Sequence, residues 1–141
     1  AEFGDKCGPR GNDRHVRGLN SFNVGGDEAE EPVITTVNKG SEGVLEALEH
    51  LEQSGQLKNI KAVMLDVDGT ITLKDGTVDP RLIKKLCDLA EGGVHIIFAT
   101  GRDSGVLKMT LPVILANKPS AEALGLFEHY MFNGAACARI Q

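Results

Sequence analysis

The chain has 141 residues, 41% of them hydrophobic and 25% charged, which is the balance of a soluble globular protein of one ordinary domain or less. A net charge of -5 and a pI near 5.3 give no basic footprint for nucleic acid, so we expect no nucleic-acid partner. No apolar run approaches the roughly 20 residues that cross a bilayer, and no signal-peptide core opens the sequence, so we expect no membrane segment and no secretion.

Three scattered cysteines, Cys7, Cys87 and Cys137, form no Cys-x-x-Cys pair. This spacing argues against a disulfide scaffold and a structural zinc site, and it favours a reducing compartment such as the cytoplasm or an organelle matrix. Cys87 and Cys137 lie in apolar contexts, where we expect small core residues.

Residues 1–39 are rich in Gly, Asn, Asp, Arg and Glu and would bury little apolar surface, so we expect a flexible polar N-terminal segment. Its basic residues could form a partner patch or simply a solvated tail. A short strand is possible at residues 33–37. We expect residues 40–141 to form the core domain, opening with a helix that Ser41 caps and that ends near Gly55.

An apolar run at residues 61–65 ends abruptly in Asp66, Asp68, Gly69 and Thr70. The run predicts a buried strand that delivers polar groups at its carboxyl end, where open α/β sheets bind ligands. One carboxylate could act as a nucleophile and the other could transfer protons, with a divalent cation screening their repulsion.

Two simpler interpretations of these aspartates are a calcium-binding loop and a surface turn. A calcium loop needs a ligand at its fifth position and glycine at its sixth, but the sequence has Thr70 and Ile71 there, which excludes it. A surface turn remains open, although a turn does not require the apolar run before it.

Residues 71–78 alternate around Asp75-Gly76, which predicts a hairpin. Asp79 and Pro80 then predict a helix start, with a stop at Gly92-Gly93.

The apolar run at residues 94–99 predicts a second, parallel strand, so Thr100, Gly101 and Arg102 should emerge at the same sheet edge as Asp66. The next helix should start at Asp103 or Ser104 and should end or kink at Pro112. A short helix at residues 120–124 and a third strand at 129–132 then lead to Asn133-Gly134.

Three of these segments carry a resemblance to one family. Asp66-Val67-Asp68-Gly69-Thr70 resembles the first motif of the haloacid dehalogenase superfamily of phosphohydrolases, and Ile96 to Arg102 resembles its second motif. Met131-Phe132-Asn133-Gly134-Ala135 is similar to the Asn-Gly-Ala segment of the Cof-type branch. The order of the three, over about half of the chain, makes the signal specific.

The resemblance implies an α/β fold, a three-layer Rossmann-like parallel sheet. The chain would hold its first half, with three core strands and a flap hairpin. It also implies Mg²⁺ bound by Asp66 and by the backbone carbonyl of Asp68, and a small phosphorylated metabolite as substrate. Asp66 would be the nucleophile and Asp68 the acid and base.

The resemblance further implies a set of substrate-binding residues around these two acids: Gly69, Thr70, Thr100, Gly101, Arg102, Asn133 and Gly134. For Arg102 a structural salt bridge is an open alternative to a substrate or loop contact. For Asn133 and Gly134 a plain hairpin turn is open.

The sequence departs from the family after Ala135, because no counterpart of the third-motif lysine, of the fourth-motif acids or of the cap follows. We therefore expect a partial core that a missing C-terminal half or another chain completes. Two hypotheses follow: a Cof-type magnesium-dependent phosphatase present as a truncated core, or a non-catalytic subunit that completes its sheet with another chain. A phosphate-binding module without turnover is a third.

Overall fold

The computed structural model of the chain describes residues 22–24 and 34–140. They belong to two compact units, 1–59 and 60–141. Most of the predicted flexible segment lies outside the described residues, so its flexibility and the predicted boundary at residue 39/40 stay predictions.

The first unit holds two short strands and a helix. Its elements are β1 (Phe22–Val24), β2 (Ile34–Thr36), α1 (Gly40–Gln53) and the 3₁₀ turn η3 (Leu57–Asn59), and β1 pairs with β2 in parallel. The strand predicted within residues 33–37 is therefore present. The predicted cap at Ser41 is wrong, because α1 already begins at Gly40 and Lys39 is its N-cap.

A carboxylate on α1 binds the segment that precedes the helix. Glu46 accepts hydrogen bonds from the backbone N–H groups of Val37 and Asn38, at 2.8 and 3.0 Å, and so holds the chain that enters the helix. These bonds lower the pKa of Glu46, since they favour its charged form.

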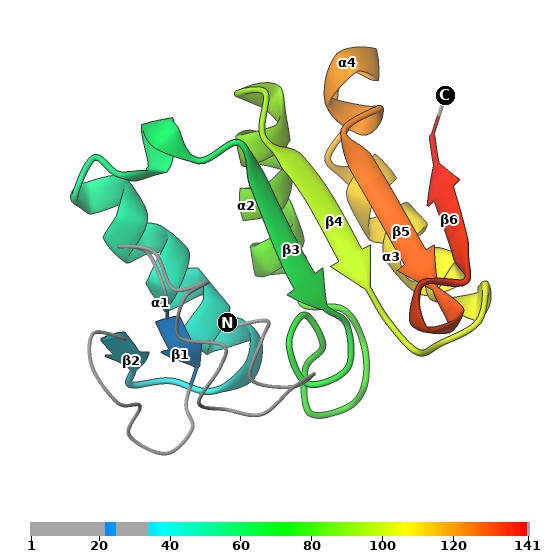
Figure 1. Ribbon diagram of the computed structural model, residues 1–141, viewed down its shortest axis with the longest axis horizontal. Helices are drawn as coiled ribbons and strands as arrows, with labels where there is room; N and C mark the ends of the chain where they lie inside the picture. The colour runs from blue at the N-terminus through cyan, green and yellow to red at the C-terminus, as the bar shows by residue number, and fades with distance from the viewer. Residues whose placement is uncertain (1–21, 25–33, 141) are drawn as a thin grey trace. The chain divides into compact units, whose positions relative to one another are not determined.

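The second unit is an α/β unit built on one four-stranded sheet, as Figure 1 shows. Its elements are β3 (Ala62–Asp66), α2 (Pro80–Glu91), β4 (His95–Ala99), α3 (Gly105–Ala116), α4 (Ala121–Leu124), β5 (Phe127–Met131), the 3₁₀ turn η4 (Phe132–Gly134) and β6 (Ala136–Arg139). The strand order is β3-β4-β5-β6, with the first three parallel and β6 antiparallel to β5. The predicted α/β class with a parallel sheet is confirmed.

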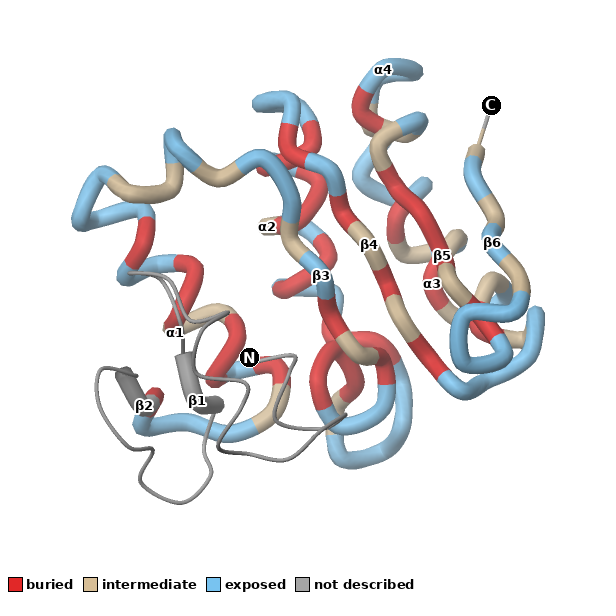
Figure 2. Tube along the Cα trace, in the orientation of Figure 1, coloured by how far each residue is buried: buried red, intermediate tan, exposed pale blue. Residues whose placement is uncertain are grey.

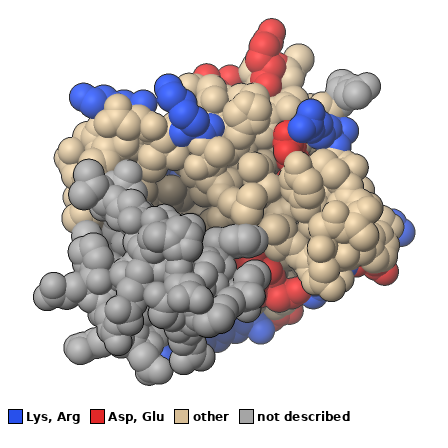
Figure 3. Space-filling model, viewed as in Figure 1, with Lys and Arg blue, Asp and Glu red and all other residues tan. Residues whose placement is uncertain are grey.

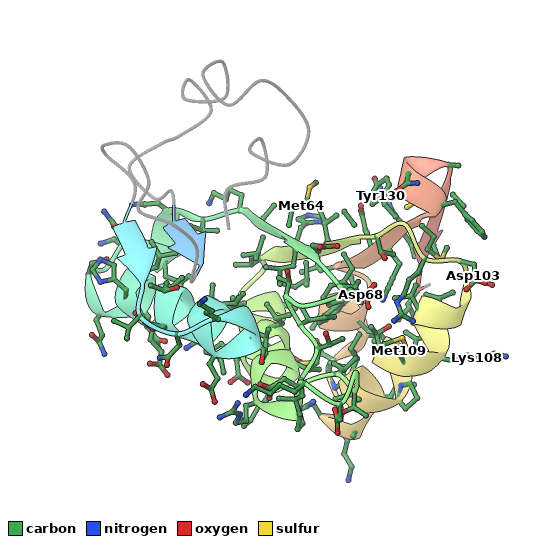
Figure 4. All side chains as sticks on the ribbon, turned by 90° about the horizontal axis from the view of Figure 1, so that it is seen from below. Met64, Asp68, Asp103, Lys108, Met109 and Tyr130 are labelled. Carbon is green, nitrogen blue, oxygen red and sulfur yellow. The ribbon has the colours of Figure 1, made fainter. Side chains whose placement is uncertain are left out.

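The core of this unit lies between the sheet and α2, α3 and α4, which cover one face of it (Figures 1 and 4). Leu65, Phe98 and His129 stand side by side on neighbouring strands and are all buried. Figure 2 shows buried positions along β5, on β4 and on α2, whereas most of β3 is exposed or intermediate. The buried residues of α2 are Leu82, Ile83, Leu86, Cys87, Leu89 and Ala90.

No helix of the described part of this unit covers the opposite face of the sheet, on which Met64 and Tyr130 lie (Figure 4). Met64 is 43% exposed there. The face is largely uncharged over the strands, as Figure 3 shows. An ion pair of 2.8 Å between Arg139 and Glu128 joins β6 to β5 on it.

The start of α2 follows its predicted signals. The buried carboxylate of Asp79 accepts a hydrogen bond from the N–H of Arg81 at 3.0 Å, and Pro80 opens the helix, as expected for a capped N-terminus. The predicted hairpin before it is reduced to one antiparallel bridge between Thr72 and Val78. The chain there is a loop with a single pairing, with a turn at Gly76.

Two expectations in the second half of the unit need correction. The helix α3 does not end at Pro112 but continues to Ala116, because buried Thr110 and Ile114 anchor it on both sides of the proline, and the alternative of a kink there stays a prediction. Cys137 is exposed on β6, whereas Cys87 is buried as expected.

Candidate functional site

The first site segment follows β3, which is an edge strand of the described sheet. Asp66 ends β3 half-buried, and its Oδ1 accepts a hydrogen bond from the N–H of Val67 at 2.9 Å. Val67 and Ile71 are completely buried and anchor the turn between them, so Asp68 is carried outward and its side chain is 56% exposed.

Gly69 makes this turn possible. Its φ of +72° lies in the left-handed region, which a residue with a Cβ seldom adopts. Its N–H donates to the hydroxyl of Thr72 at 2.9 Å, and the N–H of Thr70 donates to the carbonyl of Val67 at 3.2 Å. Thr70 itself is buried, so its predicted substrate contact stays a prediction.

The second site segment follows β4 at the same sheet edge. The buried Thr100 accepts a hydrogen bond from the N–H of Arg102 at 3.0 Å, and this bond closes a tight turn around Gly101. Arg102 thereby leaves the strand end half-exposed.

The side chain of Arg102 forms an ion pair with Asp68 in the first segment, through two of its nitrogens. Its Nη2 donates to Oδ1 of Asp68 at 2.7 Å and its Nε donates to Oδ2 at 2.9 Å, which is the paired geometry that guanidinium and carboxylate groups favour. Its Nη1 also lies 3.3 Å from the sulfur of Met109 on α3. Figure 4 shows Asp68 close to Met109.

The ion pair favours the charged form of Asp68. Hydrogen bonds from Arg102, aided by its positive charge, lower the pKa of Asp68 below its ordinary value, although partial burial opposes the shift. The pKa of Arg102 is raised by the same hydrogen bonds. Asp68 therefore keeps its charged form to lower pH than an ordinary aspartate does.

The third site segment is the turn after β5, which sits directly on the second. The N–H groups of Phe132 and Asn133 donate to the carbonyls of Arg102 and Thr100, at 2.8 and 3.1 Å. The side chain of Asn133 lies against Gly101 so closely that a Cβ on that glycine would meet Oδ1 of Asn133 at 2.9 Å. Glycine at position 101 thus allows the two turns to pack.

The structure brings all three predicted segments to one edge of the sheet. Asn133 and Gly134 have φ values of +55° and +92°, a left-handed pair that fits the turn expected from the sequence. Two contributors, Thr72 and Met109, were not predicted from the sequence, and Phe132 stands in the third predicted segment without an assigned role. Thr72 contributes one hydrogen bond, to the N–H of Gly69, and Met109 contributes one contact, to Nη1 of Arg102. No sequence pattern predicts single contacts of this kind.

The sequence model of the haloacid dehalogenase-like hydrolases matches residues 63–138, which is more than half of the chain and includes all three segments. The chain belongs to the haloacid dehalogenase-like hydrolase family. A solved haloacid dehalogenase-like hydrolase from Bacteroides thetaiotaomicron is similar at 22% identity and a TM-score of 0.47, covering 57% of this chain. The chain spans 28% of the length of that structure. No curated protein matches the chain.

Two oxygen donors at the candidate site suit Mg²⁺, although they would supply only part of its ligands. Among residues 22–24 and 34–140, no group of three or more His, Cys, Asp and Glu side chains is placed to hold a metal ion. Magnesium, however, keeps several waters and takes one or two carboxylates together with substrate phosphate. The carboxylate of Asp66 and the backbone carbonyl of Asp68 are hard oxygen donors of that kind, while Arg102 engages the carboxylate of Asp68.

No helix within the described residues has the length and apolarity that crossing a bilayer requires.

Proposed function

We propose that the chain carries the nucleophile-bearing part of a magnesium-dependent phosphatase of the Cof-type branch. It would hydrolyse monoesters of small phosphorylated metabolites through an aspartyl-phosphate, in the cytoplasm or an organelle matrix. The observation that carries this proposal is the paired hydrogen bonding of Arg102 to Asp68, two residues after Asp66. It supports the proposal because the groups that would serve as nucleophile, acid and anion-binding cation come from neighbouring strand ends.

The first chemical step uses both acids. An oxygen of the Asp66 carboxylate forms a bond to phosphorus while the ester P–O bond breaks, and Asp68 donates a proton to the departing alkoxide. Thr100 and the N–H of Gly101 would hold the transferring phosphoryl group, with Gly69 and Thr70 beside them, because stabilising its charged oxygens is most of the catalytic task. Asn133 and Gly134 would form the rim.

The second step returns the enzyme to its starting state. Asp68, now a carboxylate, accepts a proton from water as the water oxygen attacks phosphorus, and the bond to Asp66 breaks to release inorganic phosphate. Bound Mg²⁺, held by Asp66 and the Asp68 carbonyl, would supply neutralisation of the phosphoryl charge.

The ion pair imposes a condition on this scheme. Asp68 is charged while Arg102 holds it, so it can act as an acid only after the pair opens. A phosphoryl dianion is a strong competitor for a guanidinium, so substrate arrival would draw Arg102 away. The negative charge of the dianion would then raise the pKa of Asp68, which would take up a proton from solvent before acting as the acid.

Substituting Asp66→Asn in the full-length natural polypeptide tests the proposal. We expect magnesium-dependent hydrolysis of an aryl phosphate to fall about 10³-fold or more, because the bond-forming oxygen is weakened as a nucleophile. Removing the metal with a chelator should have a comparable effect. The matched control is Asp88→Asn on α2, an acid whose side chain is 60% exposed, and it should leave turnover unchanged. Normal turnover in Asp66→Asn would remove Asp66 from the mechanism.

The position of β3 supports a second candidate, a non-catalytic subunit or fragment whose sheet another chain completes. β3 lies at the edge of the described four-stranded sheet, and parallel strands are usually paired and covered on both sides. The intact mass of the natural protein, measured natively and after denaturation, separates the two. A longer polypeptide favours the phosphatase, whereas a stable hetero-complex without hydrolysis favours the subunit. Tight phosphate binding without turnover would instead favour a phosphate-binding module.

A further inference from the structure

Phe132 has a backbone conformation that its side chain does not explain. Its φ is +52°, and the next two residues, Asn133 and Gly134, also have positive φ values. Asparagine and glycine tolerate this region, whereas an aromatic residue there is a genuine outlier. Such outliers concentrate at functional sites.

Packing does not account for the ring either. Phe132 is 47% exposed, while Phe98 and Phe127 in the core of the same unit are completely buried. The turn needs only the main chain of residue 132, whose N–H donates to Arg102 and whose carbonyl accepts from the N–H of Ala135 at 3.2 Å. An asparagine or glycine would make the same two bonds with less strain.

Phe132 lies next to the groups of the candidate site. Its N–H is bonded to the carbonyl of Arg102, whose guanidinium holds Asp68, so the aromatic residue belongs to the rim of the candidate site. Apart from Met109, the side chains that make contacts there are polar or charged. Small-molecule sites combine a few polar groups that fix orientation with an apolar surface that contacts the rest of the ligand.

We propose that Phe132 is a specificity-determining contact for the leaving group, favouring phosphate esters whose alcohol presents a flat apolar face over acyclic polar ones. This inference rests on the proposed phosphatase function. The phosphoryl group would be held by the residues at the strand ends, and the ring of Phe132 would pack against the ester beyond it.

The test measures binding in the full-length Asp66→Asn protein, which prevents turnover, with Mg²⁺ present. Calorimetry compares phenyl phosphate, glycerol 1-phosphate and inorganic phosphate. In the Phe132→Asn variant, which suits the left-handed backbone, we expect phenyl phosphate to bind about 3- to 10-fold more weakly, since that is the range that one aromatic pair contributes. Binding of the other two ligands should be unchanged, and Phe132→Tyr should retain the preference.

Leu115→Asn is the matched control, since Leu115 on α3 is 51% exposed and is also apolar. It should alter none of the three affinities. Equal weakening of all three ligands in Phe132→Asn would show that Phe132 only shapes the turn, and no weakening would show that it touches nothing; either overturns the inference while the phosphatase proposal stands. If the Asp66→Asn protein with Phe132 unchanged binds none of the three ligands, both the proposed function and this inference are overturned.

Discussion

The layer beneath the sheet and the carboxyl edge of the same strands are built in opposite ways. Beneath the sheet, Phe98, Phe127 and His129 are 0–1% exposed, and the rings of the first two lie 6.2 Å apart. At the edge, the side chains of Asp68 and Arg102 are 56% and 44% exposed. Packing therefore stabilises one region, and directed polar contacts organise the other.

This difference has a measurable consequence. Substitutions in the buried layer should lower the free energy of unfolding, whereas substitutions at the edge should change charge states and ligand binding with little effect on stability. A large loss of stability from a substitution at the edge, or none from one in the buried layer, would contradict this difference.

The largest effect on stability is expected for Phe98→Ala. Phe98 lies on β4, is completely buried, and contacts the rings of Phe127 and His129. Removing its ring leaves a cavity, so the free energy of unfolding should fall by about 3–5 kcal/mol in denaturant titrations.

The control for this loss is Leu115→Ala on α3, where a half-exposed side chain is shortened. Its cost should stay within about 1 kcal/mol. Equal losses in the two variants would mean that the Phe98 site is not the packed centre described here.

A smaller effect is expected from the buried histidine. Burial lowers the pKa of His129 from 6.5 to about 4 in the folded protein. Its Nε2 lies 2.8 Å from the hydroxyl of Thr110, which itself donates to the carbonyl of Val106. The hydroxyl must then accept from the ring, so Nε2 carries the proton of a neutral imidazole.

The sign of the pH dependence follows from the lowered pKa. The unfolded chain gains a proton on His129 as the pH falls below 6.5, while the folded chain stays neutral until about pH 4. The contribution of His129 to stability should therefore decrease from pH 6.5 to 4 by at most about 3 kcal/mol, and this group should add no further loss below pH 4.

Denaturant midpoints across this pH range test the prediction. His129→Gln cannot titrate and should flatten that part of the profile, whereas substituting the exposed His95→Gln should keep it. An unchanged slope in His129→Gln would place the acid sensitivity elsewhere.

The sequence predicted the buried layer well because its signals are repeated. Apolar runs marked β3 and β4, and Asp79-Pro80 marked the start of α2. Continuous runs and caps are local features, and burial in the parallel sheet reinforces them. The three turn segments were also predicted, and they meet at one edge because the strands that precede them are parallel neighbours.

The sequence failed where a long-range contact overrides a local signal. β6 was missed because Ala136–Arg139 has small residues without a strong strand pattern, and its pairing depends on β5 and on the ion pair of Arg139 with Glu128. The stop expected at Pro112 was outweighed by the buried residues of α3. Whether Arg102 meets Asp68, 34 residues away, could not be decided from spacing.

The smallest effect on stability, and the sharpest test of the edge, is expected for Arg102→Gln. Loss of the guanidinium removes the main cause of the lowered pKa of Asp68, so this pKa should rise toward its ordinary value. A carbon-detected NMR titration of the Asp68 carboxyl measures the change without requiring activity. Lys84→Gln is the control, because Lys84 forms an exposed pair with Asp88 on α2 and should leave the titration of Asp68 unaltered.

The stability of Arg102→Gln completes the comparison. Because the folded pKa of Asp68 is lowered, the pair stabilises the fold above the unfolded pKa of that acid, and the contribution disappears as the pH falls through the folded value. Both side chains are about half exposed, so solvent screens the pair and the loss of stability at neutral pH should be small beside that of Phe98→Ala. A loss as large as that of Phe98→Ala would make Arg102 part of the scaffold, whereas a shifted Asp68 titration with unchanged stability assigns it to the chemistry of the edge.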